Sequence, residues 1–330
     1  AVCGRNIVEK FSQYKVLGLS PEEALLDVHC GLGVGQLATV HVGNFDVRRE
    51  FLFLGSPIDQ VSAAESIAEC GQLVASSEAL SVLKKTSNIS DEILSSTGPQ
   101  IIAYRESKYF DVKDKFINYE DKEKRCHYQL TYVSKHIMES LKTVFSLYVH
   151  QAARRTHRQG FNALADAEIR SVYTMFIKPQ IVPKITGDIA TDGVLFSMLN
   201  NIMGVILRVL NQYKGHLRQF IVDDKGVVVI ATFGQRGATF PNMVTEKGLP
   251  ASIAIHRLLK MDLDLDSSVG ASFGQAYCGV VGASHRHEFA ILGPSVNLAA
   301  RLMCSKYNPG ILVDESVRKM ASKRYDFFAL

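Results

Sequence analysis

The sequence lacks tryptophan, a strong excess of either charge, a zinc-type cysteine cluster and a long uninterrupted apolar run. Its 37 basic and 33 acidic residues give a formal net charge of +4, which is too mild and too dispersed to predict binding to nucleic acid. The six cysteines are scattered, without the close Cys/His spacing of a zinc site. We therefore expect reduced thiols in an intracellular, cytoplasmic protein.

The most apolar long stretch, residues 193–213, is interrupted by Asn200, Asn201 and Arg208. No clean span of about twenty apolar residues remains, so the stretch predicts an amphipathic helix packed on a sheet and no transmembrane segment. The opening residues lack the pattern of a secretory signal peptide. Because the chain begins with Ala1 and not with Met, we expect a piece of a longer protein.

What the sequence does contain is an internal repeat. The clearest pair of segments is EFLFLG and EFAILG, in which four of six residues are identical. Three such pairs recur in the same order, about 240 residues apart: 31–43 with 270–282, 50–55 with 288–293, and 73–80 with 311–318. Each copy predicts two strands joined by a Gly/Gln turn, a third strand, a helix and a short strand. A common hairpin-plus-helix pattern without shared ancestry is the alternative, but the ordered set favours duplication.

The segments that precede the two copies differ in length. The second follows a predicted buried strand over 171–181, the helix over 193–213 and a hairpin over 218–234 that turns at Asp224 to Gly226. The first follows only a helix over 1–11. We expect an α+β protein with two tandem copies, the first incomplete at its N-terminal side. The expected boundaries are 1–100 for the first domain, 101–168 for a charged linker and helix, and 169–330 for the second domain.

The run GQAYCGVVGASHRHEFAILGPSVNLAARL (274–302) resembles the class III nucleotidyl cyclases with tandem cyclase domains, and most of all the soluble, bicarbonate-responsive adenylyl cyclases. The resemblance covers about 1–80 and 170–320. It implies ferredoxin-like βαββαβ domains that pair as a pseudo-symmetric dimer and bind ATP at their interface. It further implies two Mg²⁺ or Mn²⁺ ions, and attack of the ribose 3′-hydroxyl on the α-phosphate with release of pyrophosphate.

The resemblance places the catalytic pair at Asn297, which would orient the ribose, and Arg301, which would meet the α-phosphate. Arginine suits this role because its charge is permanent and its donors are planar and directional. For a helix arginine in general, a surface salt bridge is the commoner use. The first copy has Asp59 and Ala63 at the two equivalent positions. The resemblance therefore implies one competent site and one site without the catalytic pair, although simple drift in a degenerate copy is an alternative.

Several positions depart from the family pattern. The two positions that select the purine hold Gln219, which can hydrogen-bond a base edge, and Ala290, which cannot. Arg218 precedes Gln219, but strand alternation would point it to the opposite face. Val296 also falls at the nucleotide site, and His29 stands where relatives carry a phosphate-binding Lys or Arg. The expectation that ATP is the substrate therefore comes from the overall resemblance. The two positions also lack the Glu/Cys pair that is usual in guanylyl cyclases.

The metal-binding aspartates of the family are not found in this chain. Lys178 occupies the opening-strand position, and Asp224 is explained by its hairpin turn. We expect the metal ligands on a missing N-terminal part, and little or no activity from these residues alone. The alternative is a catalytically impaired pseudo-cyclase that binds nucleotide or dimerises as a regulatory module.

Overall fold

A computed structural model gives the structure of the chain. It describes residues 2–15, 25–43, 47–86, 102–104, 135–150, 153, 167–223, 226–235, 242–283 and 286–329. The chain divides into two compact units, and each is described by itself. The first unit comprises 1–38 with 53–137, and the second comprises 39–52 with 138–330. Of the expected linker and helix over 101–168, the structure describes 102–104, 135–150, 153, 167 and 168; the rest of that range and the turn residue Asp224 lie outside the described residues.

The second unit is built on a sheet with the strand order β12-β11-β8-β10-β9, in which β13 also pairs with β11. The α+β fold with a βαββαβ order is confirmed. The order along the chain is β8 (Glu168–Pro179), α7 (Ile189–Tyr213), β9 (His216–Asp223), β10 (Gly226–Phe233), α8 (Leu249–Leu263) and β11 (Ser267–Ala283). A π-helix over Val244–Gly248 leads into α8. The chain continues through β12 (Arg286–Leu292), α9 (Pro294–Cys304), β13 (Ile311–Val313) and α10 (Glu315–Ala321).

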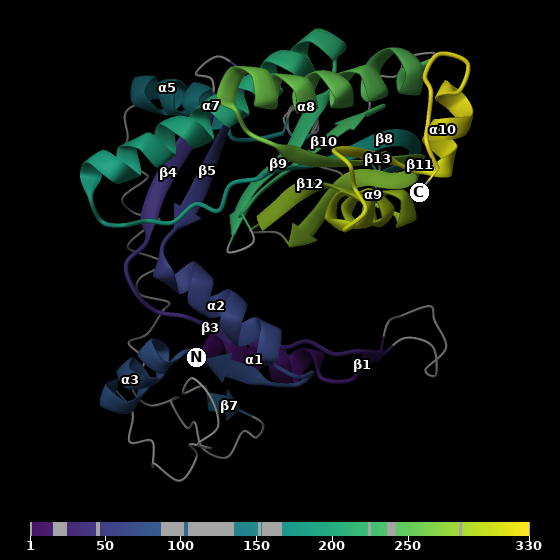
Figure 1. Ribbon diagram of the computed structural model, residues 1–330. Helices are drawn as coiled ribbons and strands as arrows, with labels where there is room; N and C mark the ends of the chain where they lie inside the picture. Colours follow the sequence, from purple (N-terminus) through teal and green to yellow (C-terminus); the bar gives the residue numbers. More distant parts are fainter. Residues whose placement is uncertain are drawn as a thin grey trace. The chain divides into compact units, whose positions relative to one another are not determined.

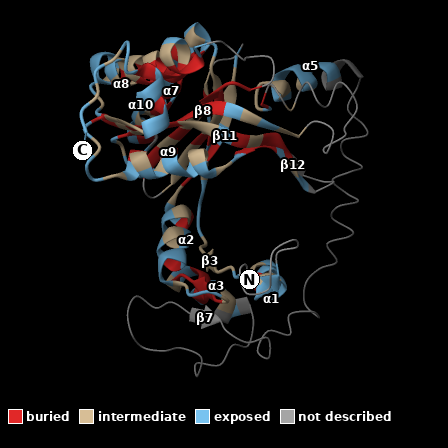
Figure 2. Cartoon of the chain, turned by 90° about the vertical axis from the view of Figure 1, so that its right-hand side faces the viewer, coloured by how far each residue is buried: buried red, intermediate tan, exposed pale blue. Residues whose placement is uncertain are grey.

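Helix α7 is the apolar stretch singled out in the sequence. Asp188 caps its start by accepting a hydrogen bond from the Thr191 backbone, and Lys214 ends it in the left-handed conformation. By length and composition α7 could cross a membrane. However, side chains along it, such as Leu199, Ile202 and Ile206, are at most 1% exposed, as the red colour of its inner side in Figure 2 illustrates. We therefore interpret α7 as the core helix of the second unit.

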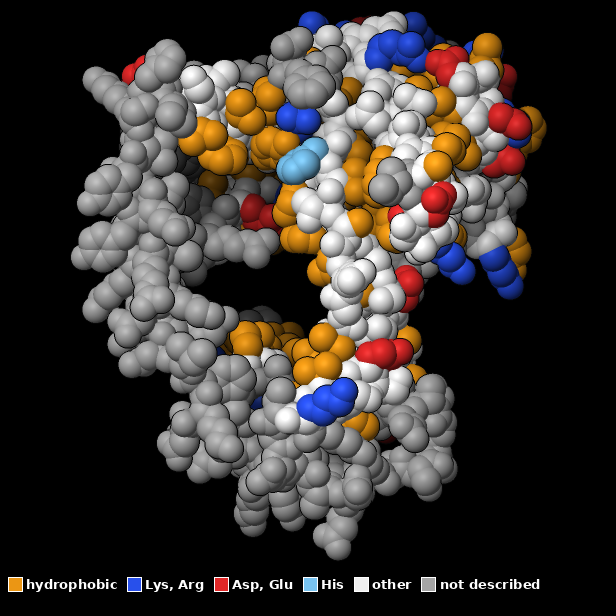
Figure 3. Space-filling view, turned by 90° about the vertical axis from the view of Figure 1, so that its left-hand side faces the viewer, with side chains coloured by type: hydrophobic (Ala, Val, Ile, Leu, Met, Phe, Trp, Pro, Cys, Tyr) orange, Lys and Arg blue, Asp and Glu red, His pale blue; other side chains and the backbone are white. Residues whose placement is uncertain are grey.

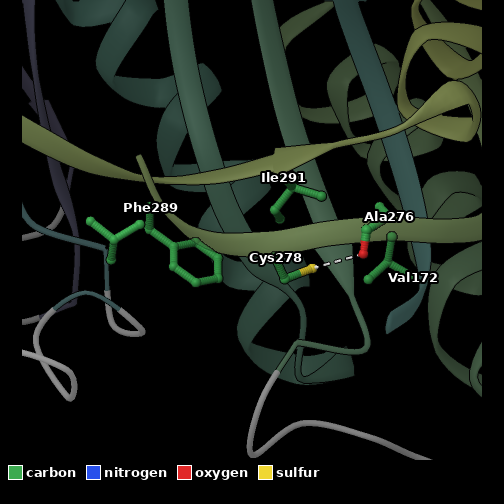
Figure 4. Packing of buried hydrophobic residues seen from close by; sticks show 6 residues of the cluster. Val172, Ala276, Cys278, Phe289 and Ile291 are labelled. Atoms are coloured by element: carbon green, nitrogen blue, oxygen red, sulfur yellow. Dashed lines mark hydrogen bonds between the residues drawn. The ribbon is translucent and has the colours of Figure 1, made fainter. Parts of the chain in front are cut away.

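Helices cover both faces of this sheet. Helices α7 and α8 lie on one face and α9 on the other (Figure 1). On β8, Tyr173 points toward α8, where its hydroxyl lies 2.8 Å from the Ser252 hydroxyl. Burial raises the pKa of Tyr173, while the hydrogen bond with Ser252 acts in the opposite direction. On the opposite face, Val172 packs with residues of β11 and β12 (Figure 4): Ala276, Cys278, Val280, Phe289 and Ile291. Val296 of α9 packs against this cluster.

The first unit contains the equivalents of the second unit's later elements. These are α1 (Val2–Phe11), β3 (Cys30–Leu32), α2 (Ser56–Ile67), β6 (Leu73–Ala75) and α3 (Ser77–Thr86). The described residues add a two-stranded sheet of β1 (Tyr14–Lys15) with β2 (Leu25–Leu26), and β7 (Ile102–Tyr104) antiparallel to β6.

The two copies of the repeat predicted from the sequence share the same strand pairing and the same contact between strand and helix. Strands β3 and β6 pair in parallel with Gly31 opposite Val74, and β11 and β13 pair in parallel with Gly270 opposite Leu312. A β-carbon on Gly31 would clash with the carbonyl of Val61 in α2. One on Gly270 would clash in the same way with the carbonyl of Ala299 in α9, the equivalent helix position. In both copies, glycine is what allows the helix backbone to lie directly on the strand.

The hairpin of the first copy, β4 (Ala38–Gly43) and β5 (Arg49–Leu54), packs mainly with the second unit. The backbone N–H of Gly43 donates to Oδ1 of Asn200 in α7 at 2.9 Å. Tyr148, which follows α5 (Lys135–Ser146), lies 3.0 Å through its hydroxyl from Nδ1 of His41. Figure 3 views the side on which β4 and β5 are drawn in Figure 1, and it shows hydrophobic side chains gathered there among a few charged ones.

Candidate active site

Helix α9 presents the predicted catalytic pair to solvent. The helix starts after Gly293 with Pro294, whose fixed φ suits the first turn. Ala299 and Met303 are 0% and 6% exposed, and they fix which side of the helix faces the sheet. Asn297 and Arg301 lie one turn apart and are both exposed.

Neither side chain is used by the part of the structure that is described. Among the described residues, Asn297 and Arg301 make no side-chain hydrogen bond or ion pair. A surface arginine that serves stability is normally paired with a carboxylate, as Arg318 is with Glu315 at 2.6 Å. The arrangement can therefore offer a permanent positive charge with five N–H donors, together with an amide that both donates and accepts.

The positions predicted to select the base lie on strands β9 and β12. Gln219 is partly exposed, whereas Ala290 is 3% exposed and offers no polar atom. Strand β9 carries a bulge here, because Gln219 opposes Ile230 and Leu217 opposes Ala231, which leaves Arg218 as an extra residue. The alternation expected of a regular strand therefore fails at Arg218. Its Nη2 donates to Oε1 of Glu288 on β12 at 3.2 Å. This pair was not identified from the sequence, which carries no signal for a bulge at this point.

A second charged pair adjoins Arg218. On the hairpin of the first copy, Arg48 donates through Nη2 to Oε1 of Glu50 at 2.6 Å. Burial raises the pKa of Glu50, while the charges of Arg48 and Arg218 act in the opposite direction. The guanidinium of Arg218 therefore interacts with two carboxylates, with Glu288 through a hydrogen bond and with Glu50 through its charge.

The remaining predicted nucleotide contacts lie elsewhere. Val296 packs against the core cluster under α9, so its side chain is used in packing. His29 belongs to the first unit, where its Nε2 lies 3.4 Å from Oε1 of Glu65. The first copy's Asp59 and Ala63, on α2, are exposed like the α9 residues to which they correspond.

The described residues do not fit a pair of divalent cations. Lys178, at the opening-strand position on β8, is a cation and cannot be a ligand. Within the described ranges, no group of three or more His, Cys, Asp or Glu side chains is gathered that could hold a metal ion.

Comparison with known proteins finds relatives over nearly the whole chain. Adenylate cyclase type 10 of Oryctolagus cuniculus is 23% identical over 325 residues, which is 95% of this chain and 19% of the relative. Adenylate cyclase type 10 of Rattus norvegicus is 24% identical over 309 residues, 90% of this chain and 18% of the relative. The human enzyme of the same name is 32% identical over 124 residues, 37% of this chain and 8% of the relative. The chain thus spans less than a fifth of the length of these curated relatives, and the resemblance in the sequence is confirmed.

Solved structures give a weaker likeness. A bacterial light-regulated adenylyl cyclase has a TM-score of 0.45 at 18% identity, covering 74% of this chain and 73% of that one. The adenylyl cyclase CyaB from P. aeruginosa has a TM-score of 0.41 at 20% identity, covering 48% of this chain and 83% of that one. No protein-family model matches the sequence.

Proposed function

We propose that this chain, a homologue of adenylate cyclase type 10, forms part of a nucleotidyl cyclase that converts ATP to 3′,5′-cyclic AMP and pyrophosphate. The observation that carries the proposal is the pair on α9. Asn297 and Arg301 are exposed one turn apart, and the described structure makes no use of their side chains. The relatives support a nucleotidyl cyclase of the class III type. The choice of ATP and an intracellular, cytoplasmic signalling role are further parts of the proposal.

The proposed chemistry gives each side chain one task. The ribose 3′-oxygen attacks the α-phosphorus and loses its proton, while the bond from the α-phosphorus to the bridging oxygen breaks and pyrophosphate leaves. Negative charge builds on the α-phosphoryl oxygens, where the guanidinium of Arg301 would donate hydrogen bonds. Asn297 would hold the ribose so that the 3′-oxygen lies in line with the leaving group.

Two further elements come from the resemblance alone. One is the pairing of the two cyclase domains, 1–100 and 169–330, within one chain. The other is a pair of Mg²⁺ or Mn²⁺ ions, which in this chemistry would neutralise the polyphosphate. The described residues do not fit such ions.

The test is Arg301→Ala in the full-length protein, with cyclic AMP formation measured from ATP in the presence of Mn²⁺. We expect a loss of about a hundredfold or more in kcat, since removal of one donor to a developing oxyanion typically has that effect. Arg318→Ala is the matched control, because Arg318 is a helix arginine already paired with Glu315. A loss at Arg301 below about tenfold, or about 1.4 kcal/mol of barrier, would refute the assigned role.

A second candidate function is a pseudo-cyclase that binds nucleotide without turning it over. Lys178 at the metal position and Ala290 at the base position favour it. Titration with a fluorescent ATP analogue separates the two. Tight binding without cyclic AMP under any divalent cation supports the pseudo-cyclase, and turnover excludes it.

A further inference from the structure

The bulge on β9 changes which residues can face a base. It sets two consecutive residues, Arg218 and Gln219, against the single residue Ile230 of β10. The alternation that would separate their side chains is lost at such a bulge. Arg218 reaches across to β12 and contacts Glu288 there.

Strand β12 supplies the complementary partner. Glu288 and Ala290 lie two residues apart, so they share a face of this strand. Ala290 has only a methyl group, whereas the side chain of Glu288 is 60% exposed. Along β12, the carboxylate of Glu288 is therefore a polar group two residues from the position expected to select the base, on the same face of the strand.

Within the described residues, the pair keeps hydrogen-bonding capacity that its own contact does not use. The guanidinium of Arg218 has five N–H donors, and its contact to Glu288 uses one of its nitrogens. A carboxylate accepts through two oxygens, and among the described residues Arg218 occupies only Oε1 of Glu288. The adenine edge requires a donor to its ring nitrogen N1 and an acceptor from its 6-amino group, and these two side chains provide one of each.

The charges around the pair favour a neutral group over a phosphate. Two cations, Arg218 and Arg48, stand with two carboxylates, Glu288 and Glu50, so the cluster has no net positive charge. Phosphate groups are bound where positive charge is in excess. A neutral purine, which is recognised by hydrogen bonds, fits this surrounding better.

On the basis of the proposed function, we infer that Arg218 and Glu288 read the purine edge of the nucleotide, in place of the side chains at the expected positions Gln219 and Ala290. Arg218 donates to N1 of adenine, and Glu288 accepts from the 6-amino group. Guanine has a hydrogen on N1 and an oxygen at position 6, so a guanine bound in the same orientation would set the Arg218 donors against the N1 hydrogen and the Glu288 carboxylate against the oxygen, and the pair favours adenine.

The first experiment measures the preference for ATP over GTP in Arg218→Ala and Glu288→Ala. It uses the dissociation constants of fluorescent ATP and GTP analogues and, where turnover is found, kcat/KM for both nucleotides. We expect the preference to fall about tenfold or more in each variant, as for the loss of a charge-assisted hydrogen bond. The matched control is Arg208→Ala, which removes a 2.6 Å pair with Asp262 elsewhere in the same unit and should leave the preference unchanged.

The double exchange Arg218→Glu with Glu288→Arg separates base reading from a structural link between β9 and β12. It keeps an ion pair but exchanges the positions of donor and acceptor, so we expect the fold to persist and the preference for ATP to be lost. A preference within threefold of the wild type in both single variants, or in the exchange variant, overturns the inference. If the wild type binds neither nucleotide, the proposed function falls with it. If the wild type binds and only the preference is unaffected by the variants, the inference alone falls.

Discussion

Equivalent residues of the two copies are buried to very different extents. Phe51 and Phe53 on β5 are each 46% exposed, whereas their equivalents on β12, Phe289 and Ile291, are 7% and 6% exposed. In the second copy β11 pairs with β8 from Ser267 to Cys278, and α9 also packs on β8. No strand at the corresponding edge of β3 or β4 is found among the described residues.

This difference separates what a copy determines by itself from what its neighbours determine. The register of the parallel pair and the close approach of helix to strand at Gly31 and Gly270 are the same in both copies. These contacts follow from the copy's own sequence. Burial of the third strand differs between its two faces: Leu52 and Leu54 of β5 are 5% and 4% exposed, whereas the face of Phe51 and Phe53 corresponds to the one that packs with Val172 of β8 in the second copy. The proposed catalytic pair is independent of both, because α2 has Asp59 and Ala63 where α9 has Asn297 and Arg301.

The largest effect is expected from Gly270→Ala, which tests whether the shared contact supports the site. The new methyl group would clash with the backbone of α9 at Ala299 and Met303, and backbone cannot move aside as a flexible side chain can. We expect a loss of about 3 kcal/mol in the stability of α9, from overpacking. Because the chain divides into two units, the measurement is local hydrogen exchange of the α9 amides.

Two further variants test this prediction, one at the equivalent position of the first copy and one as a control. Gly31→Ala places the methyl group against α2 in the same way, so the first copy should also lose stability locally. Gly204→Ala in α7 is the control, since a β-carbon there meets nothing within 4 Å. It should stabilise α7 by about 0.5–1 kcal/mol, because alanine is the better helix former. Equal behaviour of Gly270→Ala and Gly204→Ala would contradict the shared close contact.

An intermediate effect is expected at two equivalent helix caps. Asp314 caps α10 through Oδ1, which accepts from the Val317 backbone, and it also accepts from the buried hydroxyl of Ser272 at 2.7 Å. Asp314→Ala removes the cap and leaves Ser272, 0% exposed, without that acceptor. We expect α10 to lose about 2–3 kcal/mol of stability, which is the sum of the contributions of a cap and a buried hydrogen bond.

The first copy has Ser76 at the same position before α3. Its hydroxyl accepts from the Ala79 backbone and donates to Oε1 of Gln60. Oε1 of Gln60 also accepts from the Val34 backbone, so Ser76→Ala leaves it with a partner. We expect α3 to lose about 1 kcal/mol of stability, which is the contribution of the cap alone, as measured by hydrogen exchange of the α3 amides. A larger loss at Ser76 than at Asp314 would reverse the comparison.

Much of this organisation could be predicted from residues alone. The repeat, the element order and the exposure of Asn297 and Arg301 follow from patterns that lie within a few residues of one another. The bulge at Arg218 could not be predicted, because strand alternation is a local rule and the bulge depends on how β9 meets β10. The cluster of Arg218, Glu288 and Glu50 joins three strands that are far apart in sequence, so no local pattern indicates it.

The smallest effect concerns two carboxyls of the second unit whose pKa values shift in opposite directions. Glu50, on the first copy's hairpin, has its pKa raised by burial, against the influence of Arg48 and Arg218. Its folded form therefore binds a proton more strongly than the unfolded form, whose pKa is about 4.3. The wild type should lose stability as pH rises from that value through the raised pKa.

Asp192 in the first turn of α7 should give the opposite slope. Its pKa is lowered, chiefly by a hydrogen bond from the Thr186 backbone, with further bonds from the Thr186 hydroxyl and the Gly187 backbone. Its contribution is present above the unfolded pKa of about 3.9 and is lost as pH falls through the lowered value. Denaturant midpoints between pH 3 and 7 should therefore lose the falling component in Glu50→Gln and the rising component in Asp192→Asn. If both variants changed the slope in the same direction, Glu50 would not be buried in the folded second unit, and the charged cluster that includes Arg218 would not form.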